Sequence, residues 1–192
     1  MSLKHRRLAY WSHKLEAMGW LVIGRQQRAL ETFFSMLSRW PNDAYALASR
    51  AHLLAQLGRR AEAIVDAQSL TRAHPQRSAA DWFNLAFLLE AEGRFVEAES
   101  SFRSALAMDP KLDRAWYGLG LVLIRTQRLD EAVQALKRNT DLQPMSPYGW
   151  YQLARVHMER HDPDAARKVI AHLKGFEPKV AAQLERETGL AG

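Results

Sequence analysis

The chain has 192 residues, of which 47% are hydrophobic, and its formal net charge is +6. This composition suffices for one globular domain or one short solenoid with a continuous core. The absence of cysteine excludes disulfides, thiolate metal sites and cysteine nucleophiles. The N-terminal apolar runs are too short for a signal peptide or a membrane span, so we expect a cytoplasmic protein.

The first predicted element is a helix at the N-terminus with an apolar stripe at 3-4-3-4 spacing. The stripe consists of Leu8, Trp11, Leu15, Met18 and Val22. It differs from the face that would pack on the next helix through Ala17 and Trp20, and a helix that is apolar on two sides needs two partners. Either other N-terminal residues or a neighbouring repeat cover the stripe, or it mediates self-association or captures a partner helix.

Basic residues lie beside this stripe, and they suggest two further partners, an anionic membrane and a nucleic acid. Lys4, His5, Arg6, Arg7 and Lys14 could face an anionic membrane, although membrane contact would compete with protein packing for the same stripe. Nucleic acid is the other reading, but the basic residues are concentrated in residues 1–40, whereas residues 79–112 are acidic. A continuous phosphate track is therefore not expected, and we expect neither partner.

From residue 44 onward the chain repeats itself. Tryptophan, alanine and proline landmarks recur at intervals of 34 residues, at Trp82, Trp116 and Trp150, at Ala98, Ala132 and Ala166, and at Pro110, Pro144 and Pro178. One extra residue falls between Pro75 and Trp82, in a turn that tolerates insertion. A fixed period of this length indicates stacked supersecondary units.

The residues within one unit predict a pair of helices. Trp116, Leu119, Gly120 and Leu123 have the i, i+3, i+4, i+7 spacing of one helical face, and the glycine allows a second helix to approach closely. Asp162 followed by Pro163 reads as an N-cap and a first helical residue. The recurring prolines are expected to end each second helix.

These landmarks resemble the tetratricopeptide-repeat family, with its W-x2-L-G-x2-Y…A-x3-F…P pattern. The stretches "WFNLA", "WYGLG" and "WYQLA" supply the first half, and Phe102, Leu136 and Ile170 follow their alanines by four. The resemblance implies an all-α, right-handed superhelical solenoid of about five antiparallel helix pairs. Its units would be a degenerate first repeat 10–43, repeats 44–78, 79–112, 113–146 and 147–180, and a C-terminal cap 181–192. In the second repeat, Arg50 stands where leucine is usual.

In this family the first helices of successive repeats line a concave groove that binds peptides. Mapping by repeat offset predicts groove residues Tyr45, His52, Phe83, Asn84, Phe87, Arg114, Tyr117, Leu121, Arg125, Tyr148, Tyr151, Gln152 and Arg155. Aromatic, amide and arginine side chains suit an extended or helical peptide. The alternative is that some of these aromatics pack between neighbouring first helices.

One subclass of the family clamps the C-terminal carboxylate of a chaperone with Lys, Asn and Arg residues. Asn84 and Arg114 match two clamp positions, but the other three hold Ala48, His52 and Gly118. We therefore do not expect a chaperone-tail clamp.

The motifs of enzymes and metal sites are incomplete in this sequence. "GWLVIGRQQ" lacks the Lys-Ser/Thr of a P-loop, and "HMERH" places His157 and His161 four apart without the zincin glutamate. No nucleophile elbow appears. We expect a non-catalytic adaptor without cofactor or metal that binds another protein in the groove. The alternative is a self-associating scaffold that acts through the N-terminal stripe, a homo-oligomer.

Overall fold

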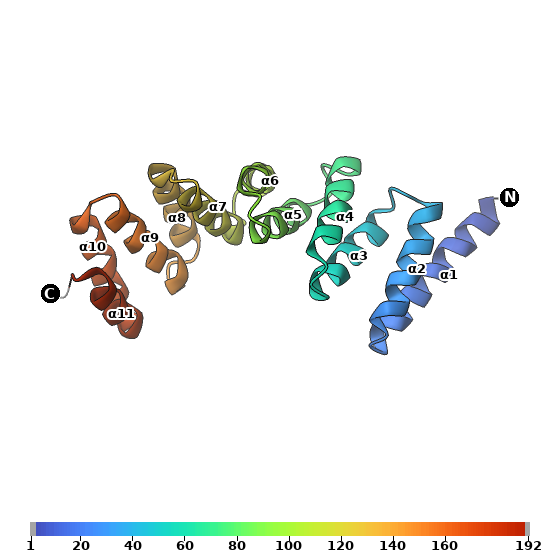
Figure 1. Ribbon diagram of the computed structural model, residues 1–192, viewed down its shortest axis with the longest axis horizontal. Coiled ribbons are helices and arrows are strands. Elements are labelled where there is room, and N and C mark those ends of the chain that lie inside the picture. Colours follow the sequence, from blue (N-terminus) through green and yellow to red (C-terminus); the bar gives the residue numbers. More distant parts are fainter. Residues whose placement is uncertain (1–2, 191–192) are drawn as a thin grey trace. The chain divides into compact units, whose positions relative to one another are not determined.

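The structure, a computed structural model, describes residues 3–190, except for the side chains of residues 3, 4 and 6. The predicted basic residues Lys4 and Arg6 thus lie outside the described side chains. Residues 3–190 form eleven α-helices and no strand (Figure 1). They are α1 (Leu3–Val22), α2 (Gln26–Arg39), α3 (Ala44–Gln56), α4 (Arg60–Ala73), α5 (Ala79–Ala91), α6 (Phe95–Met108), α7 (Asp113–Arg125), α8 (Leu129–Leu142), α9 (Pro147–Glu159), α10 (Pro163–Lys174) and α11 (Pro178–Thr188).

The helices belong to two compact units that divide between Glu92 and Gly93. In unit 1 each helix packs on the next, from α1 to α5. In unit 2 the same order runs from α6 to α11, and α11 also packs on α9. Sequential packing of this kind means that each helix pair buries its apolar face mainly against its chain neighbours.

Polar caps and prolines set several helix boundaries. The side chains of Asp43, Ser78 and Asp162 accept hydrogen bonds from backbone N–H groups in the first turns of α3, α5 and α10. Asp162 followed by Pro163 begins α10 as predicted. Pro178 differs from the prediction, because it begins α11 instead of ending α10. Its fixed φ suits the first turn of a helix.

The recurring tryptophans and prolines are joined by hydrogen bonds. The indole nitrogens of Trp82, Trp116 and Trp150 donate at 2.8–2.9 Å to the backbone oxygens of Pro75, Pro110 and Pro144, respectively. Each hydrogen bond links the first helix of a repeat to the turn that precedes that helix. The 34-residue recurrence of both residue types thus has a local structural cause.

Small residues permit close helix packing, as predicted. A Cβ atom on Gly120 would lie 2.8 Å from Leu136 Cγ, so α7 and α8 could not keep their present separation with a larger residue there. A Cβ atom on Gly118 would likewise clash with the ring of Phe102, which is buried. In unit 1, Ala17 of α1 and Ala29 of α2 are fully buried.

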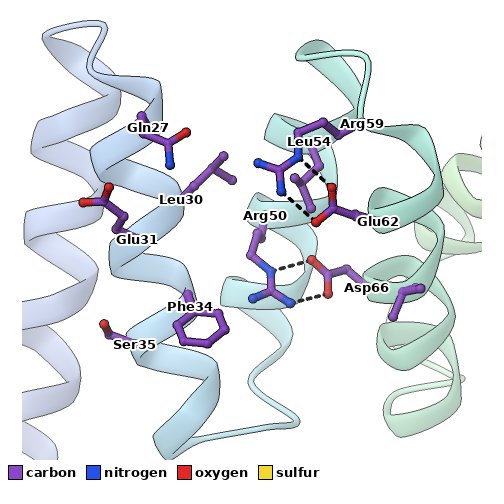
Figure 2. Close-up of a pocket in the computed structure, with 11 residues that line it drawn as sticks. Gln27, Leu30, Glu31, Phe34, Ser35, Arg50, Leu54, Arg59, Glu62 and Asp66 are labelled. Atoms are coloured by element: carbon purple, nitrogen blue, oxygen red, sulfur yellow. Dashed lines mark hydrogen bonds and ion pairs between the residues drawn. The ribbon is translucent and has the colours of Figure 1, made fainter.

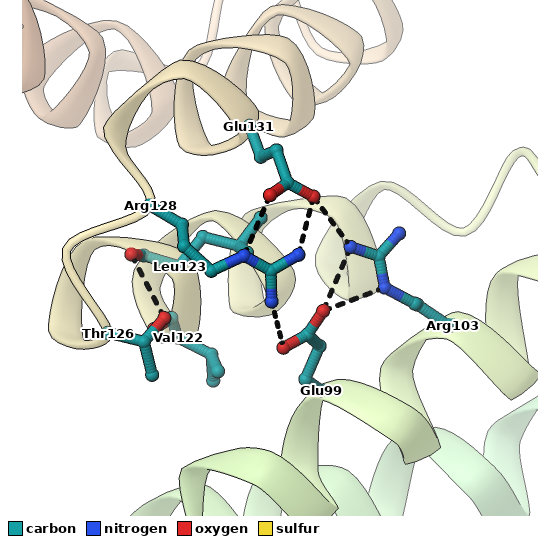
Figure 3. A network of polar contacts seen from close by, with 7 residues as sticks. All are labelled: Glu99, Arg103, Val122, Leu123, Thr126, Arg128 and Glu131. Carbon is teal, nitrogen blue, oxygen red and sulfur yellow. Dashed lines mark hydrogen bonds and ion pairs between the residues drawn. The ribbon is translucent and has the colours of Figure 1, made fainter.

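The surface of unit 2 carries a four-residue ion-pair network that joins α6 to α8 (Figure 3). The Arg128 guanidinium donates to Glu131 at 2.6 and 2.7 Å and to Glu99 at 2.7 Å. Arg103 bridges the same two carboxylates at 2.9 and 3.1 Å. Hydrogen bonds from Arg128 hold the pKa of Glu131 below its ordinary value. Bonds to Glu131 and Glu99 raise the pKa of Arg128 in turn.

Candidate functional site

The predicted groove residues of unit 1 lie on α3 and α5, and none of them is buried. Phe87 is 58% exposed, and its ring stacks on that of Phe83 with centroids 6.5 Å apart. His52 and Asn84 are exposed, whereas Tyr45 is half-buried. This part of the chain therefore presents aromatic rings and short polar groups to solvent.

The N-terminal stripe is also open to solvent. Its exposed fractions are 70% for Leu8, 51% for Trp11, 63% for Leu15, 46% for Met18 and 86% for Val22. Ala17, on the other side of α1, is completely buried. One prediction was that other N-terminal residues or a neighbouring repeat cover the stripe. Within the described residues no segment does so. The role of the stripe in binding stays a prediction.

The stripe and the unit 1 groove residues form one face, which the sequence analysis treated as two. Trp11 and Met18 precede Tyr45 and His52 by one repeat of 34 residues, so they occupy equivalent positions on α1 and α3. The Lys14 ammonium joins the two helices, because it lies 5.1 Å from the Trp11 ring centroid and 4.2 Å from that of Tyr45. The 34-residue spacing in the sequence could have shown that the stripe on α1 and the groove residues on α3 belong to one face.

The equivalent positions in unit 2, on α7 and α9, have a different chemistry. Arg114, Arg125, Tyr148 and Arg155 are exposed, and the other four predicted residues, Tyr117, Leu121, Tyr151 and Gln152, are half-buried. Tyr148 is the most open aromatic residue here, at 70%. Unit 2 thus presents guanidinium groups among aromatic rings, whereas the unit 1 face is mainly apolar.

Helix α11 occupies part of the unit 2 face. The Tyr151 hydroxyl donates to Glu187 Oε2 at 2.6 Å, and Gln183 donates to the other carboxylate oxygen at 2.7 Å. The bond to Glu187 raises the pKa of Tyr151. Around this contact lies an open cavity of about 540 Å³ lined by Tyr151, Arg155, Met158, Glu159, Glu187 and Thr188. Because Glu187 accepts from Tyr151, a ligand would meet the ring of Tyr151 and the Arg155 guanidinium.

The two histidines of "HMERH" do not share a helix face. His157 is buried near the end of α9, but His161 lies beyond the helix, in a left-handed conformation with φ 58°. A spacing of four would place both on one face of a continuous helix, but that prediction is wrong here, because α9 ends at Glu159. Within residues 3–190 no three His, Asp or Glu side chains gather as a metal site would require.

None of the helices within residues 3–190 combines the length and the apolar character needed to cross a bilayer.

Comparison with known proteins supports the architecture. Two family models, each described as tetratricopeptide repeat, match residues 49–113 and 89–150. No curated protein sequence matches the chain.

Several solved structures share the fold. A MamA protein is 17% identical with a TM-score of 0.80, over 94% of this chain and 93% of that one. YrrB, described as a TPR protein with an unusual peptide-binding site, is 16% identical with a TM-score of 0.80, over 88% of both chains. A tetratricopeptide repeat protein from Parabacteroides merdae ATCC 43184 is 18% identical with a TM-score of 0.80, over 95% of this chain and 74% of that one. At these identities the likeness concerns the fold.

Proposed function

This chain belongs to the tetratricopeptide-repeat family, and from that premise we propose that it is a non-catalytic adaptor that binds a peptide or helix of another protein on the exposed face of its first helices. Proteins of this family typically mediate protein–protein interactions. The peptide-binding site named for YrrB, which has the same fold, supports a peptide as the ligand class.

The observation that carries the proposal is the exposure of large apolar side chains at two positions of the first helices. Trp11 and Tyr148 occupy one repeat position, and Phe87 occupies the position seven residues further along. Trp11, Phe87 and Tyr148 are 51%, 58% and 70% exposed, respectively. Within unit 1, Trp11, Met18 and Phe87 are large apolar side chains exposed on the first helices, and exposed apolar surface marks interaction sites in soluble proteins. Aromatic side chains are also the residues that most often supply the binding energy of an interface.

The chemistry of each unit suggests what its part of the ligand looks like. In unit 1 the face offers Trp11, Leu15, Met18 and Phe87, which suits the apolar side of an amphipathic helix or an extended apolar segment. In unit 2 the arginines suit carbonyl or carboxylate groups of a ligand. Because both faces stand on stacked helices, they are preorganised and little ordering is needed on binding.

The proposal is tested by comparing what wild type and two variants retain from a native cell extract. The face variant carries Met18→Ala, Phe87→Ala and Tyr148→Ala. The control variant carries Val96→Ala and Met145→Ala, which are 79% and 67% exposed but lie on α6 and in the α8–α9 turn. A protein retained by wild type and the control variant but lost from the face variant supports the proposal. Equal retention by all three contradicts it.

The exposed stripe favours a second candidate function, namely self-association as an assembly scaffold. Leu8, Leu15 and Val22 are 70%, 63% and 86% exposed on one side of α1, which would become buried in a dimer. Light scattering after size exclusion tests it. We expect a concentration-dependent dimer for wild type and a monomer for Leu15→Glu, whereas a monomeric wild type at all accessible concentrations would remove this candidate.

A further inference from the structure

A groove separates α2 from α4 on the side of unit 1 that the predicted peptide site does not use. Figure 2 shows it with α2 on one side, α4 on the other and α3 behind. Its volume is about 560 Å³, in the range of sites that bind small ligands or single side chains. Leu30 and Phe34 of α2, Arg50 and Leu54 of α3, and Val65 and Asp66 of α4 are among the residues that line it.

Apolar side chains form both walls of the groove. Phe34 of α2 and Val65 of α4 are 67% and 60% exposed, although each could have been polar on an outer helix surface. Leu30 and Leu54 continue the apolar lining and are buried. A bulky apolar group placed between the walls would therefore remove Phe34 and Val65 from water.

The floor of the groove carries an ion pair that no other repeat has. Arg50 donates to Asp66 through Nε at 2.7 Å and through Nη2 at 2.6 Å, and the Asp66 side chain is only 3% exposed. The repeat positions equivalent to Arg50 hold Leu85, Leu119 and Leu153, and those equivalent to Asp66 hold Ser101, Ala135 and Val169. An apolar pair would fold at least as well, because desolvation of a buried ion pair offsets its attraction.

The geometry of Arg50 leaves hydrogen-bond donors directed at the groove. A guanidinium has five N–H groups, and the carboxylate of Asp66 takes one on Nε and one on Nη2. Figure 2 shows the remaining nitrogen of Arg50 on the side of the groove that faces Phe34. Among the described residues no acceptor bonds to this Nη1. The floor thus offers hydrogen bonds to an acceptor that enters between the walls.

The charges around the groove restrict what this acceptor can be. Three carboxylates, those of Glu31, Glu62 and Asp66, line it together with two guanidinium groups, those of Arg50 and Arg59. Arg59 is already bound to Glu62 at 2.7 Å through both of its contacts. Glu31 is in turn paired with Arg28 at 3.4 Å, so each of the three carboxylates has a guanidinium partner. A ligand carboxylate would therefore find no unbalanced positive charge to offset its desolvation, whereas an uncharged carbonyl needs only the N–H groups of Arg50 Nη1.

We propose that the α2–α4 groove is a second binding site, which takes a bulky apolar side chain of a partner polypeptide, while Arg50 Nη1 donates a hydrogen bond to the adjoining uncharged backbone carbonyl. Arg50 and Leu54 follow Tyr45 by five and nine residues, which at about 100° per residue places them on roughly the opposite side of α3. The groove is therefore independent of the first-helix face, and one partner can occupy each.

The test uses N-acetyl-L-phenylalanine amide as the probe and amide nuclear magnetic resonance of the full chain as the readout. We expect shift changes confined to α2, α3 and α4, with a dissociation constant on the order of millimolar for a probe of about fifteen non-hydrogen atoms. N-acetyl-L-phenylalanine, which carries a carboxylate instead, is expected to bind at least about fivefold more weakly. No shifts in these helices at saturating probe, or equal binding of both probes, would overturn the proposal.

Two variants separate the walls from the floor. Phe34→Ala/Val65→Ala removes exposed side chains only and is expected to fold and to lose probe binding. Arg50→Leu/Asp66→Ser introduces the residues of the third repeat, Leu85 and Ser101, and is expected to abolish the preference for the uncharged probe. Unchanged binding by the wall variant, or an unchanged preference in the floor variant, would refute the assigned roles.

Discussion

Between residues 44 and 180, two polar residues occupy leucine positions of the repeat, one in each unit, and the protein accommodates them in opposite ways. Arg50 in unit 1 is aligned with Leu85, Leu119 and Leu153, and it pairs with Asp66 through two hydrogen bonds. His157 in unit 2 is aligned with Leu54, Leu89 and Leu123. Its Nδ1 has no hydrogen-bond partner and lies 3.7 Å from Asp162 Oδ2. A repeat core thus tolerates a polar group whose charge is paired with a carboxylate or that is able to stay neutral.

The difference follows from the chemistry of the two side chains. Arginine remains charged at any pH at which the protein folds, so its burial requires a partner, and Asp66 replaces the small or apolar residue found in the other repeats. Histidine can give up its proton, and burial lowers the pKa of His157 below its ordinary value. Unit 1 therefore retains a paired charge on the floor of a groove, whereas unit 2 retains a buried imidazole whose Nδ1 has no hydrogen-bond partner.

The largest effect is expected from breaking the buried pair. Asp66→Ala leaves the Arg50 guanidinium without its carboxylate. Removing one partner of a fully buried ion pair costs about 3–5 kcal/mol, and because Arg50 is 22% exposed we expect a loss near the lower end of this range. Urea denaturation followed by circular dichroism measures the change. The matched control is Arg50→Leu/Asp66→Ser, which we expect to unfold at the same urea concentration as wild type or a higher one. An Asp66→Ala midpoint equal to wild type would show that water already solvates Arg50.

Replacing His157 tests the opposite case. His157→Leu fills the position as in three other repeats and removes the unpaired Nδ1, so we expect a gain of about 1–3 kcal/mol in the free energy of unfolding. The wild-type contribution also depends on pH. Because the folded pKa lies below the unfolded value of 6.5, the unfolded chain binds the extra proton, and stability is lost as pH falls from 6.5 through the folded pKa.

Thermal melts of wild type and His157→Leu at pH 7.5 and pH 5 check both statements. The difference between the two proteins should grow at the lower pH, since the leucine variant lacks this proton-binding site. The carboxylates titrate in both proteins alike, so only the difference in stability between wild type and His157→Leu is informative. A constant difference at both pH values would mean that the pKa of His157 is the same in the folded and the unfolded chain.

The left-handed turns between paired helices differ between the units to a smaller extent. In unit 1, Gly24 and Gly58 have φ of 73° and 75°. In unit 2 the first equivalent position is Gly93, with φ of 73°, but the next two hold Gln127 and His161, with φ of 60° and 58°. Since a side chain disfavours this region, Gln127→Gly and His161→Gly should each stabilise the protein by about 0.5–1 kcal/mol. Gly58→Ala is the reverse control and should destabilise by a similar amount. A lower melting temperature for the two glycine variants, or a higher one for Gly58→Ala, would contradict the prediction that glycine is favoured in these turns.

Much of the fold was predictable because its signals are local. Trp116 and Pro110, or Asp162 and Ala165, lie within seven residues of each other, so a repeat spacing or a capping pattern displays them directly. Arg50 illustrates the limit. Its departure from leucine was visible, but its partner Asp66 lies sixteen residues away on another helix, and only the packing of α3 on α4 brings the pair together.

The candidate site was predictable in part for the same reason. Repeat offsets give the positions of Phe87 or Tyr148 on their helices, and these side chains are exposed. The bond between Tyr151 and Glu187 was missed because α11 lies outside the repeat and no offset predicts where it packs. The α2–α4 groove was missed because a cavity depends on side chains of three helices that no single pattern contains.

The smallest effect is expected from the surface network of unit 2, which sharpens the contrast with the Arg50–Asp66 pair. Glu131→Gln removes charge from a carboxylate that accepts from both Arg128 and Arg103, but these side chains are 41–49% exposed. Water solvates exposed charges before and after the change, and salt at about 1 M screens them within about 3 Å. We therefore expect a change in melting temperature that is smaller than that of the left-handed turn variants and that disappears in 1 M NaCl.

Asp66→Ala should keep its full effect in the same salt, because ions do not reach a carboxylate that is only 3% exposed. Equal salt sensitivity of the two variants would mean that the Arg50–Asp66 pair behaves as a surface contact and has no special role at the groove.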